Sequence, residues 1–149
     1  AEASAGKRLA LIAESHNRLT GRPLVPPGSD LARRLWECSA AIVAHDTQRD
    51  PVFFYGNRAA LDLFEMGAEE FVSLPSRFSA EPLVREERAR LLAEVSARGF
   101  IDDYSGIRIA KTGRRFRIAR ATVWNLVDGI GAIHGQAATF SDWLEVVDA

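Results

Sequence analysis

The sequence predicts a mixed α/β (α+β) domain: a five-stranded antiparallel sheet with short helices on one face and an extra N-terminal amphipathic helix. Three observations lead to this prediction. Apolar residues recur at helical spacing in several short segments as far as Gly99, and beyond that glycine the period changes to two. Two short runs rich in β-branched and aromatic residues precede the helical middle of the chain. Glycine-containing turns separate the later strands.

Composition limits the classes of protein to consider. With 149 residues, 47% hydrophobic and 26% charged, the chain has the size and composition of one folded domain. Its net charge of −1 provides no field that would attract nucleic acid or an anionic membrane, so neither partner is expected. The single cysteine, Cys38, excludes an internal disulfide, and with three scattered histidines we expect no metal site and a reducing cytoplasmic location.

The first helix is expected over residues 4–19, because Leu9, Ile12 and Leu19 form an apolar stripe that ends at a Gly and a Pro. We interpret residues 1–29 as this helix plus a proline-rich connector, which can lie apart from a main domain over residues 30–149. An exposed apolar stripe usually finds a partner helix. The sequence therefore predicts a homodimer through Leu9, Ile12 and Leu19, with the helix as a signal relay.

The remaining elements follow from caps, turn residues and periodicity. The longest helix is expected to end at Gly99 and to bury Leu83, Leu91, Leu92 and Val95. Two-residue turns are expected at Thr112-Gly113 and Asp128-Gly129. The predicted helices cover residues 31–37 (capped by Asp30), 58–65 (capped by Asn57), 69–73 and 81–98, and the predicted strands cover 40–45, 52–55, 100–111, 114–127 and 132–141.

Four stretches of this sequence resemble the MEKHLA domain family, which is related to PAS domains. They are PVFFYGNRAALDLFE, LPSRFSAEPLVREERARLL, GFIDDYSGIRIAKTGRRFRIARATVWNL and HGQAATF, and the similarity runs from about residue 31 to residue 143. Members of this family occur as standalone bacterial proteins, the type that this chain resembles, and at the C-terminus of plant homeodomain leucine zipper proteins. The resemblance implies a PAS-like fold for residues 30–149 and a sensory or ligand-binding role.

The resemblance also bears on cofactors. Flavin-binding PAS domains carry a cysteine in a GxNCRFLQ-like motif on a middle helix, and haem-binding PAS proteins use a histidine on a middle helix. Here Cys38 precedes the first predicted strand, and the predicted middle helices contain no histidine. Neither flavin nor haem is therefore expected, and the cofactor stays unknown.

A two-residue turn at Thr112-Gly113 would fix the pairing of the two longest strands and place a polar group on their apolar, inner face. An arginine there needs a partner, because an unpaired buried charge costs several kcal/mol. Arg120 could pair internally with Asp103 or with a glutamate of a middle helix, or it could bind an anionic or carbonyl-bearing ligand. A third alternative is that the assumed strand register is wrong. The predicted ligand-binding group on this face is Arg120, Ser105, Asp103, Thr122 and Trp124.

Other candidates have simpler alternatives. Asn57 and Arg77 border the expected pocket, but Asn57 could serve as a helix cap and Arg77 could pair with Glu81 or a nearby carboxylate. Trp124 could stack on a ligand or belong to the core. The basic segment 108–120 could bind phosphate, although a solvated face balanced by acidic residues is the simpler interpretation.

The sequence thus predicts a PAS-like sensory or ligand-binding module that signals through an unknown partner. One alternative is a protein interaction module with a filled core. Another is a small cone-shaped isomerase or hydratase, for which Asp103 is the only candidate base. Because no Ser/His/Asp order and no phosphate loop occurs, we expect no catalytic residues and no enzymatic activity.

Overall fold

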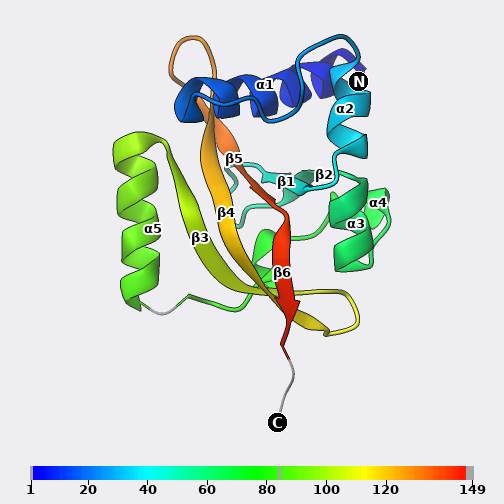
Figure 1. Cartoon of the computed structure of the whole chain (residues 1–149), viewed down its shortest axis with the longest axis vertical. Coiled ribbons are helices and arrows are strands. Elements are labelled where there is room, and N and C mark those ends of the chain that lie inside the picture. The colour runs from blue at the N-terminus through cyan, green and yellow to red at the C-terminus, as the bar shows by residue number, and fades with distance from the viewer. Residues whose placement is uncertain (1, 84, 147–149) are drawn as a thin grey trace.

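The structure of the chain, a computed structural model, describes residues 2–83 and 85–146. One six-stranded antiparallel sheet carries helices on both faces (Figure 1). The predicted fold class is confirmed. The helical elements are α1 (Glu2–Thr20), α2 (Leu31–Glu37), α3 (Arg58–Phe64), α4 (Ala68–Phe71), the 3-10 helix η1 (Ser76–Ser79) and α5 (Arg85–Arg98). The strands are β1 (Ala41–His45), β2 (Phe53–Gly56), β3 (Phe100–Ile109), β4 (Arg115–Val127), β5 (Ile133–Phe140) and β6 (Asp142–Glu145).

The strand order is β2-β1-β5-β4-β3, so the chain's first hairpin joins the edge of the later meander. The long strand β4 pairs with β5 through Thr122↔Thr139 and with β6 through Ala119↔Asp142. Strand β6 therefore continues the path of β5 in the same register, and it was not predicted as a separate strand. The interruption at Ser141 lies opposite Arg120, whose φ of 52° is left-handed and breaks the regular strand geometry of β4.

The hairpin between β3 and β4 differs from the sequence prediction by one residue. Gly113 donates to the Ala110 carbonyl at 2.9 Å and Ala110 donates to the Arg114 carbonyl at 2.9 Å, so the loop is the three residues 111–113. Gly113 has φ 89°, which is the left-handed position of a three-residue hairpin loop. The predicted two-residue turn is therefore wrong, and Arg108 pairs with Phe116 rather than with Arg117.

Two β-bulges then change which side chains share a face. Between the pairs Gly106↔Ile118 and Tyr104↔Ala121, β4 contains one residue more than β3. Between Tyr104↔Ala121 and Ile101↔Val123, β3 contains the extra residue. Each bulge reverses the alternation of its strand, because side chains of a strand alternate with a period of two.

The helices divide the core into two layers. The inner face of the sheet, which carries Val43, Tyr104 and Val123, packs against α3, α4 and α5. The back face, which carries Ile42, Trp124 and Leu126, packs against α1 and α2. A sheet covered on both faces explains why β1 is an almost continuous apolar run.

Helix α1 lies across the back face near the β4–β5 turn, as Figure 1 shows. Ile12 is fully buried there, and Leu9 and Leu19 pack against the same cluster. The Ser15 hydroxyl donates to the Val127 carbonyl at 3.1 Å. The expected exposed stripe is therefore wrong, because the sheet of the same chain covers it.

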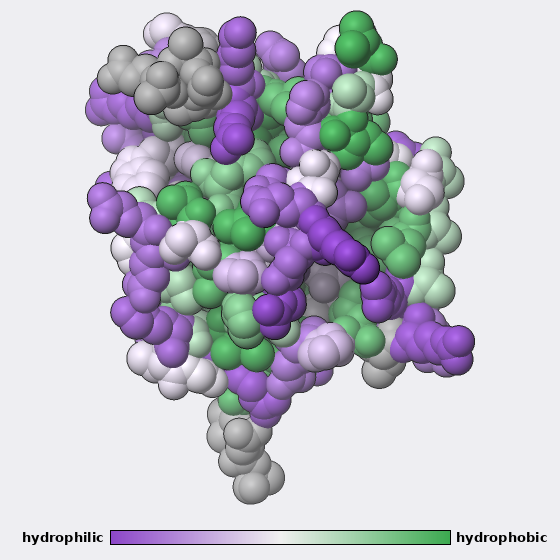
Figure 2. All heavy atoms as spheres, turned by 180° about the vertical axis from the view of Figure 1, so that it is seen from behind, coloured by the Kyte–Doolittle hydropathy of each residue, from purple (hydrophilic) through white to green (hydrophobic). Residues whose placement is uncertain are grey.

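Helix α5 begins at Arg85, four residues later than predicted. Glu81 instead donates its backbone N–H to the Ile107 carbonyl at 3.0 Å, and the following Pro82 keeps this segment extended beside β3. Val95 is buried as predicted, whereas Leu92 is 53% exposed. No helix in the described part of the chain is long and apolar enough to cross a membrane. On the face seen in Figure 2, long charged side chains interrupt the apolar areas.

Candidate functional site

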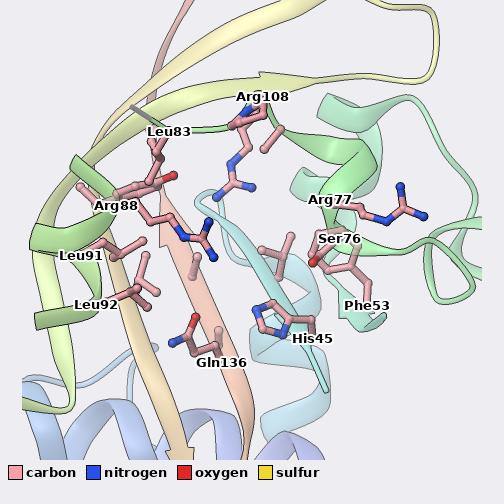
Figure 3. Close-up of a pocket in the computed structure, with 17 residues that line it drawn as sticks. His45, Phe53, Ser76, Arg77, Leu83, Arg88, Leu91, Leu92, Arg108 and Gln136 are labelled. Atoms are coloured by element: carbon pink, nitrogen blue, oxygen red, sulfur yellow. The ribbon is translucent and has the colours of Figure 1, made fainter. Parts of the chain in front are cut away.

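A cavity of about 390 Å³ lies between the inner face of the sheet and the segment formed by η1 and α5. Its walls are largely apolar, and polar groups enter from several elements (Figure 3). The lining residues are Val43, His45, Phe53, Ser76, Arg77, Ala80, Pro82, Leu83, Arg88, Leu91, Leu92, Tyr104, Arg108, Val123, Gln136, Ala137 and Ala138. A concave, mostly apolar site with a few convergent polar groups is typical of small-molecule binding.

Two arginines point their guanidinium groups into this cavity, Arg88 from α5 and Arg108 from β3 (Figure 3). Among the described residues neither has an ion pair or a hydrogen bond from its side chain, and Arg108 lies 5.9 Å from the centroid of the Tyr104 ring. None of the described lining residues is an aspartate or a glutamate. The cavity therefore carries unbalanced positive charge.

Gly106 makes room for this arrangement on β3. A Cβ atom at Gly106 would lie 2.8 Å from the Tyr104 hydroxyl, so only glycine lets the tyrosine side chain lie along the strand. The Tyr104 ring is thereby placed beside Arg108, two positions beyond Gly106 on the same face. Cation–π contact limits the positions that the Arg108 guanidinium adopts.

His45 and Gln136 form the end of the cavity opposite the two arginines (Figure 3). They face each other across the β1–β5 ladder. The Nδ1 of His45 lies 2.9 Å from the Asp46 carbonyl, which makes Nδ1 the donor and leaves Nε2 without a partner among the described residues. The Gln136 amide donates to Asn125 at 3.3 Å. This end can therefore both accept and donate hydrogen bonds.

Aromatic side chains fill the neighbouring part of the inner face. The rings of Phe53 and Phe71 stack with centroids 4.3 Å apart, and Phe64 contacts Phe71 and Phe116 at 5.7 and 5.4 Å. Phe64, Phe71 and Phe116 are at most 1% exposed. The space under α3 and α4 is thus closed core, and the cavity on this face lies beneath α5 and η1.

Arg120 does not belong to the inner face. Its side chain is 78% exposed and pairs with Asp142 at 2.8 Å. The polar group predicted from the two-residue turn is therefore wrong in its placement, because Arg120 occupies the β4 bulge. Arg120 does not line the cavity.

The other members of that predicted group are also dispersed. Asp103 lies in the β3 bulge and pairs with Arg90 at 3.2 Å in solvent, so it is no buried base. Ser105 is exposed and lines a separate depression beside Glu81 and Glu87. Thr122 is half-buried opposite Thr139, on the face opposite its inward neighbour Val123.

Trp124 and Asn57 have structural positions. Trp124 is fully buried on the back face, and its indole N–H donates to the Ile12 carbonyl at 3.1 Å. Asn57 caps α3 by accepting from Ala60 at 3.1 Å, as the alternative interpretation predicted. It also accepts from Ile42 at 2.9 Å and donates to the Leu35 and Ala40 carbonyls at 3.0 and 2.9 Å. Neither side chain reaches the cavity.

Of the predicted ligand-binding residues, Arg77 alone lines the cavity, and Figure 3 shows its guanidinium turned away from it. Its partner is the carboxylate of Asp50 at 3.0 Å, in agreement with the simpler interpretation that Arg77 pairs with Glu81 or another nearby carboxylate. In the basic segment, ion pairs balance four charges: Lys111 with Glu70, Arg114 with Glu65 and Glu145, Arg115 with Glu81, and Arg120 with Asp142. This supports the solvated-face interpretation over a phosphate surface.

Sequence reasoning missed Arg88, Arg108, His45 and Gln136. The two-residue turn would place Arg108 opposite Arg117 and away from the apolar face, whereas in the structure Arg108 lies opposite Phe116. One signal was available: Lys111-Thr112-Gly113 fits a type I turn followed by a left-handed glycine. That loop would have turned Arg108 to the inner face.

The side chains do not fit thiol chemistry on a flavin. Cys38 lies between α2 and β1 and packs against the back-face cluster, so the sheet separates it from the cavity. Burial of the neighbouring Tyr55, and to a lesser extent the charge of Cys38, raises the pKa of the Tyr55 hydroxyl to about 12. Among the described residues no group of three or more His, Cys, Asp or Glu side chains could hold a metal ion.

The fold is that of PAS domains. The chain superposes on the crystal structure of a PAS domain from Colwellia psychrerythraea with a TM-score of 0.61 and 16% identity, covering 77% of this chain and 92% of that one. It superposes on the light-state dimer structure of the fungal blue-light photoreceptor Vivid with a TM-score of 0.57 and 17% identity, covering 86% and 91%.

Within that class, the sequence matches the MEKHLA domain over residues 7–145, and the chain belongs to the MEKHLA domain family. Two homeobox-leucine zipper proteins of Arabidopsis thaliana are similar to it. ATHB-9 is 28% identical over 118 residues, which are 78% of this chain and 14% of that protein. ATHB-15 is 25% identical over 138 residues, which are 89% of this chain and 16% of that protein. The chain thus spans a small part of these relatives.

Proposed function

We propose that this chain is a sensory module that binds a small molecule in the cavity beneath α5 and η1. The PAS fold and the MEKHLA family support a sensory role. The ligand would lie against the inner face of the sheet, in contact with β1, β3, β4 and β5. Because α5 also forms one wall, a bound molecule would couple the sheet to the helix that covers it.

The observation that carries the proposal is the cavity itself. It offers about 390 Å³, which falls in the range of roughly 300–1,000 Å³ for small-molecule sites. Val43, Leu83, Leu91 and Val123 give it apolar walls, while the two inward arginines and the His45–Gln136 end supply orienting polar groups. A filled interaction module would have no reason to keep polar side chains aimed into such a space.

The isomerase or hydratase alternative receives less support. That chemistry needs an acid or base within reach of the substrate. The described lining residues provide one titratable base, His45, and Asp103 lies outside the cavity. We therefore propose binding without turnover.

A sensory module needs a partner to receive its signal, and we propose a second copy of this chain. Dimers occur among the structural neighbours, as in the light-state dimer of Vivid. The surface would not be the Leu9–Ile12–Leu19 stripe, because the sheet covers Ile12 completely. Light scattering at micromolar concentration should give the mass of a dimer, and the mass of a monomer would contradict this part of the proposal.

Native mass spectrometry of freshly purified protein tests ligand binding directly. We expect an added mass that disappears under denaturing conditions. The matched variant Val123→Trp fills the cavity from β4 and should lose the added mass while remaining folded by circular dichroism. The proposal would be contradicted if the wild-type protein carried no added mass and bound no member of a fragment library, so that it behaved as Val123→Trp does.

A further inference from the structure

We infer that the cavity selects organic anions: molecules with one oxyanion group, held by Arg88 and Arg108, on an aliphatic body. This inference rests on the proposed function and specifies its ligand class. The headgroup belongs at the arginine end of the cavity, and the body belongs along the apolar walls towards His45 and Gln136.

The charge distribution supports an anion. Acidic partners occupy most basic side chains nearby: Asp50 pairs with Arg77, Asp103 with Arg90, and Glu81 with Arg115. Arg88 and Arg108 have no such partner among the described residues, and both point at the same space (Figure 3). Two cations without a counter-charge repel each other in a partly desolvated site, so a negative ligand relieves an existing cost.

The chemistry of the donors suits an oxyanion. A guanidinium presents its N–H groups in a planar fork that matches the two oxygens of a carboxylate or a phosphate. Arg108 extends from a strand and is half-buried beside the Tyr104 ring, so it is the more restrained of the two groups. Arg88 extends from the first turns of α5 and is exposed, so it can close over a bound headgroup.

The walls define the rest of the ligand. Leu83, Leu91 and Leu92 line one side (Figure 3). Val43 of β1 and Val123 of β4 line the side formed by the sheet. These aliphatic side chains match a flexible hydrocarbon body, whose burial removes apolar surface from water. Inorganic phosphate alone would leave these walls uncovered and should bind weakly.

Isothermal titration with octanoate, octyl phosphate, octanol and inorganic phosphate tests the inference. Octanoate and octyl phosphate should both bind at least tenfold more tightly than octanol, and a difference between the two identifies the preferred headgroup. Arg88→Met and Arg108→Met should each weaken anion binding roughly 10- to 100-fold, the effect of losing a charge-assisted hydrogen bond, and leave octanol binding unchanged. Arg117→Met removes the same charge outside the cavity and should change nothing.

The outcomes separate this inference from the proposed function. Octanol that binds as tightly as octanoate would overturn the anion selectivity while the cavity still binds a small molecule. Unchanged octanoate affinity in the Arg88→Met, Arg108→Met double variant would also overturn it. If inorganic phosphate bound as tightly as octyl phosphate, the claim that the ligand has an aliphatic body would be overturned. Failure of all four probes would overturn the inference, and native mass spectrometry would still decide independently whether the cavity binds any molecule.

Discussion

The indole N–H of Trp124 donates to the main-chain carbonyl of Ile12 at 3.1 Å, and this contact fixes α1 on the back of the sheet. The His16 ring packs against the same indole in a T-shaped arrangement, with centroids 4.8 Å apart. The N-terminal helix is therefore part of the folded body. A ligand that distorts β4 from the inner face would act on α1 through this strand.

Replacement of Trp124 tests how much this attachment contributes to stability. Trp124→Phe removes the hydrogen bond and leaves space in a closed core, so we expect the free energy of unfolding to fall by about 2 kcal/mol. Trp143→Phe is the matched control, because Trp143 is 36% exposed and should change the value by less than about 0.5 kcal/mol. Urea unfolding measures both, and equal effects would contradict the role of Trp124.

Asn57 connects three segments from a fully buried position, and its amide donates to the carbonyls of Leu35 and Ala40. Asn57→Asp keeps the size of the side chain but places a carboxylate against those carbonyls, so we expect a loss of about 3 kcal/mol. Asn17→Asp is a matched control, since Asn17 accepts from Leu24 at 2.9 Å through an oxygen that aspartate retains. Thermal unfolding should show a much larger decrease for Asn57→Asp, and similar decreases would count against this assignment.

His16 should make stability depend on pH. Burial between α1 and the sheet lowers the pKa of His16 below the ordinary value of 6.5. The unfolded chain therefore takes up a proton first on acidification. The contribution of neutral His16 to the free energy of unfolding is complete above about pH 6.5. It is lost as the pH falls from there towards the lower pKa that His16 has in the folded state. The urea midpoint of the wild type should therefore be lower at pH 5.5 than at pH 7.5. His16→Phe should remove the share of this decrease that comes from His16.

His134 provides the control for that experiment. Its hydrogen bond at 2.6 Å lowers the pKa of Asp128 below 3.8. A depressed carboxyl pKa contributes stability that is present above about pH 3.8 and lost only in stronger acid. His134→Gln should therefore leave the contribution of His16 between pH 7.5 and 5.5 in place. Identical pH dependence in wild type and His16→Phe would contradict the account.

Arg120 tests the strand geometry. Its φ of 52° suits glycine and disfavours a β-branched residue, and its exposed ion pair with Asp142 contributes little. Arg120→Val should therefore be about 1–2 kcal/mol less stable than Arg120→Gly in urea unfolding. Because Arg120 lies outside the cavity, Arg120→Gly should bind octanoate as wild type does. A loss of binding would instead support the placement that the sequence first predicted.

The fold could be predicted from local signals, and the site could not. Helix caps such as Asn57 and the change of period at Gly99 can be recognised from a few neighbouring residues. The cavity depends on register, and register here follows from a three-residue loop and two bulges. A bulge depends on pairing with residues distant in sequence: Arg120, in the β4 bulge, lies opposite the interruption at Ser141. Strict alternation along β4 ignores this bulge and therefore places Trp124 on the inner face, whereas the structure places it on the back face.

Two-dimensional NMR of labelled protein during titration with octanoate and with octanol shows where these ligands bind. We expect the chemical shift perturbations to concentrate on the amides of the cavity walls, including Val43, Tyr104, Arg108 and Val123, and octanol to act at the same place with lower affinity. Perturbations confined to α1 and the back face, or none at millimolar ligand, would contradict a binding site beneath α5.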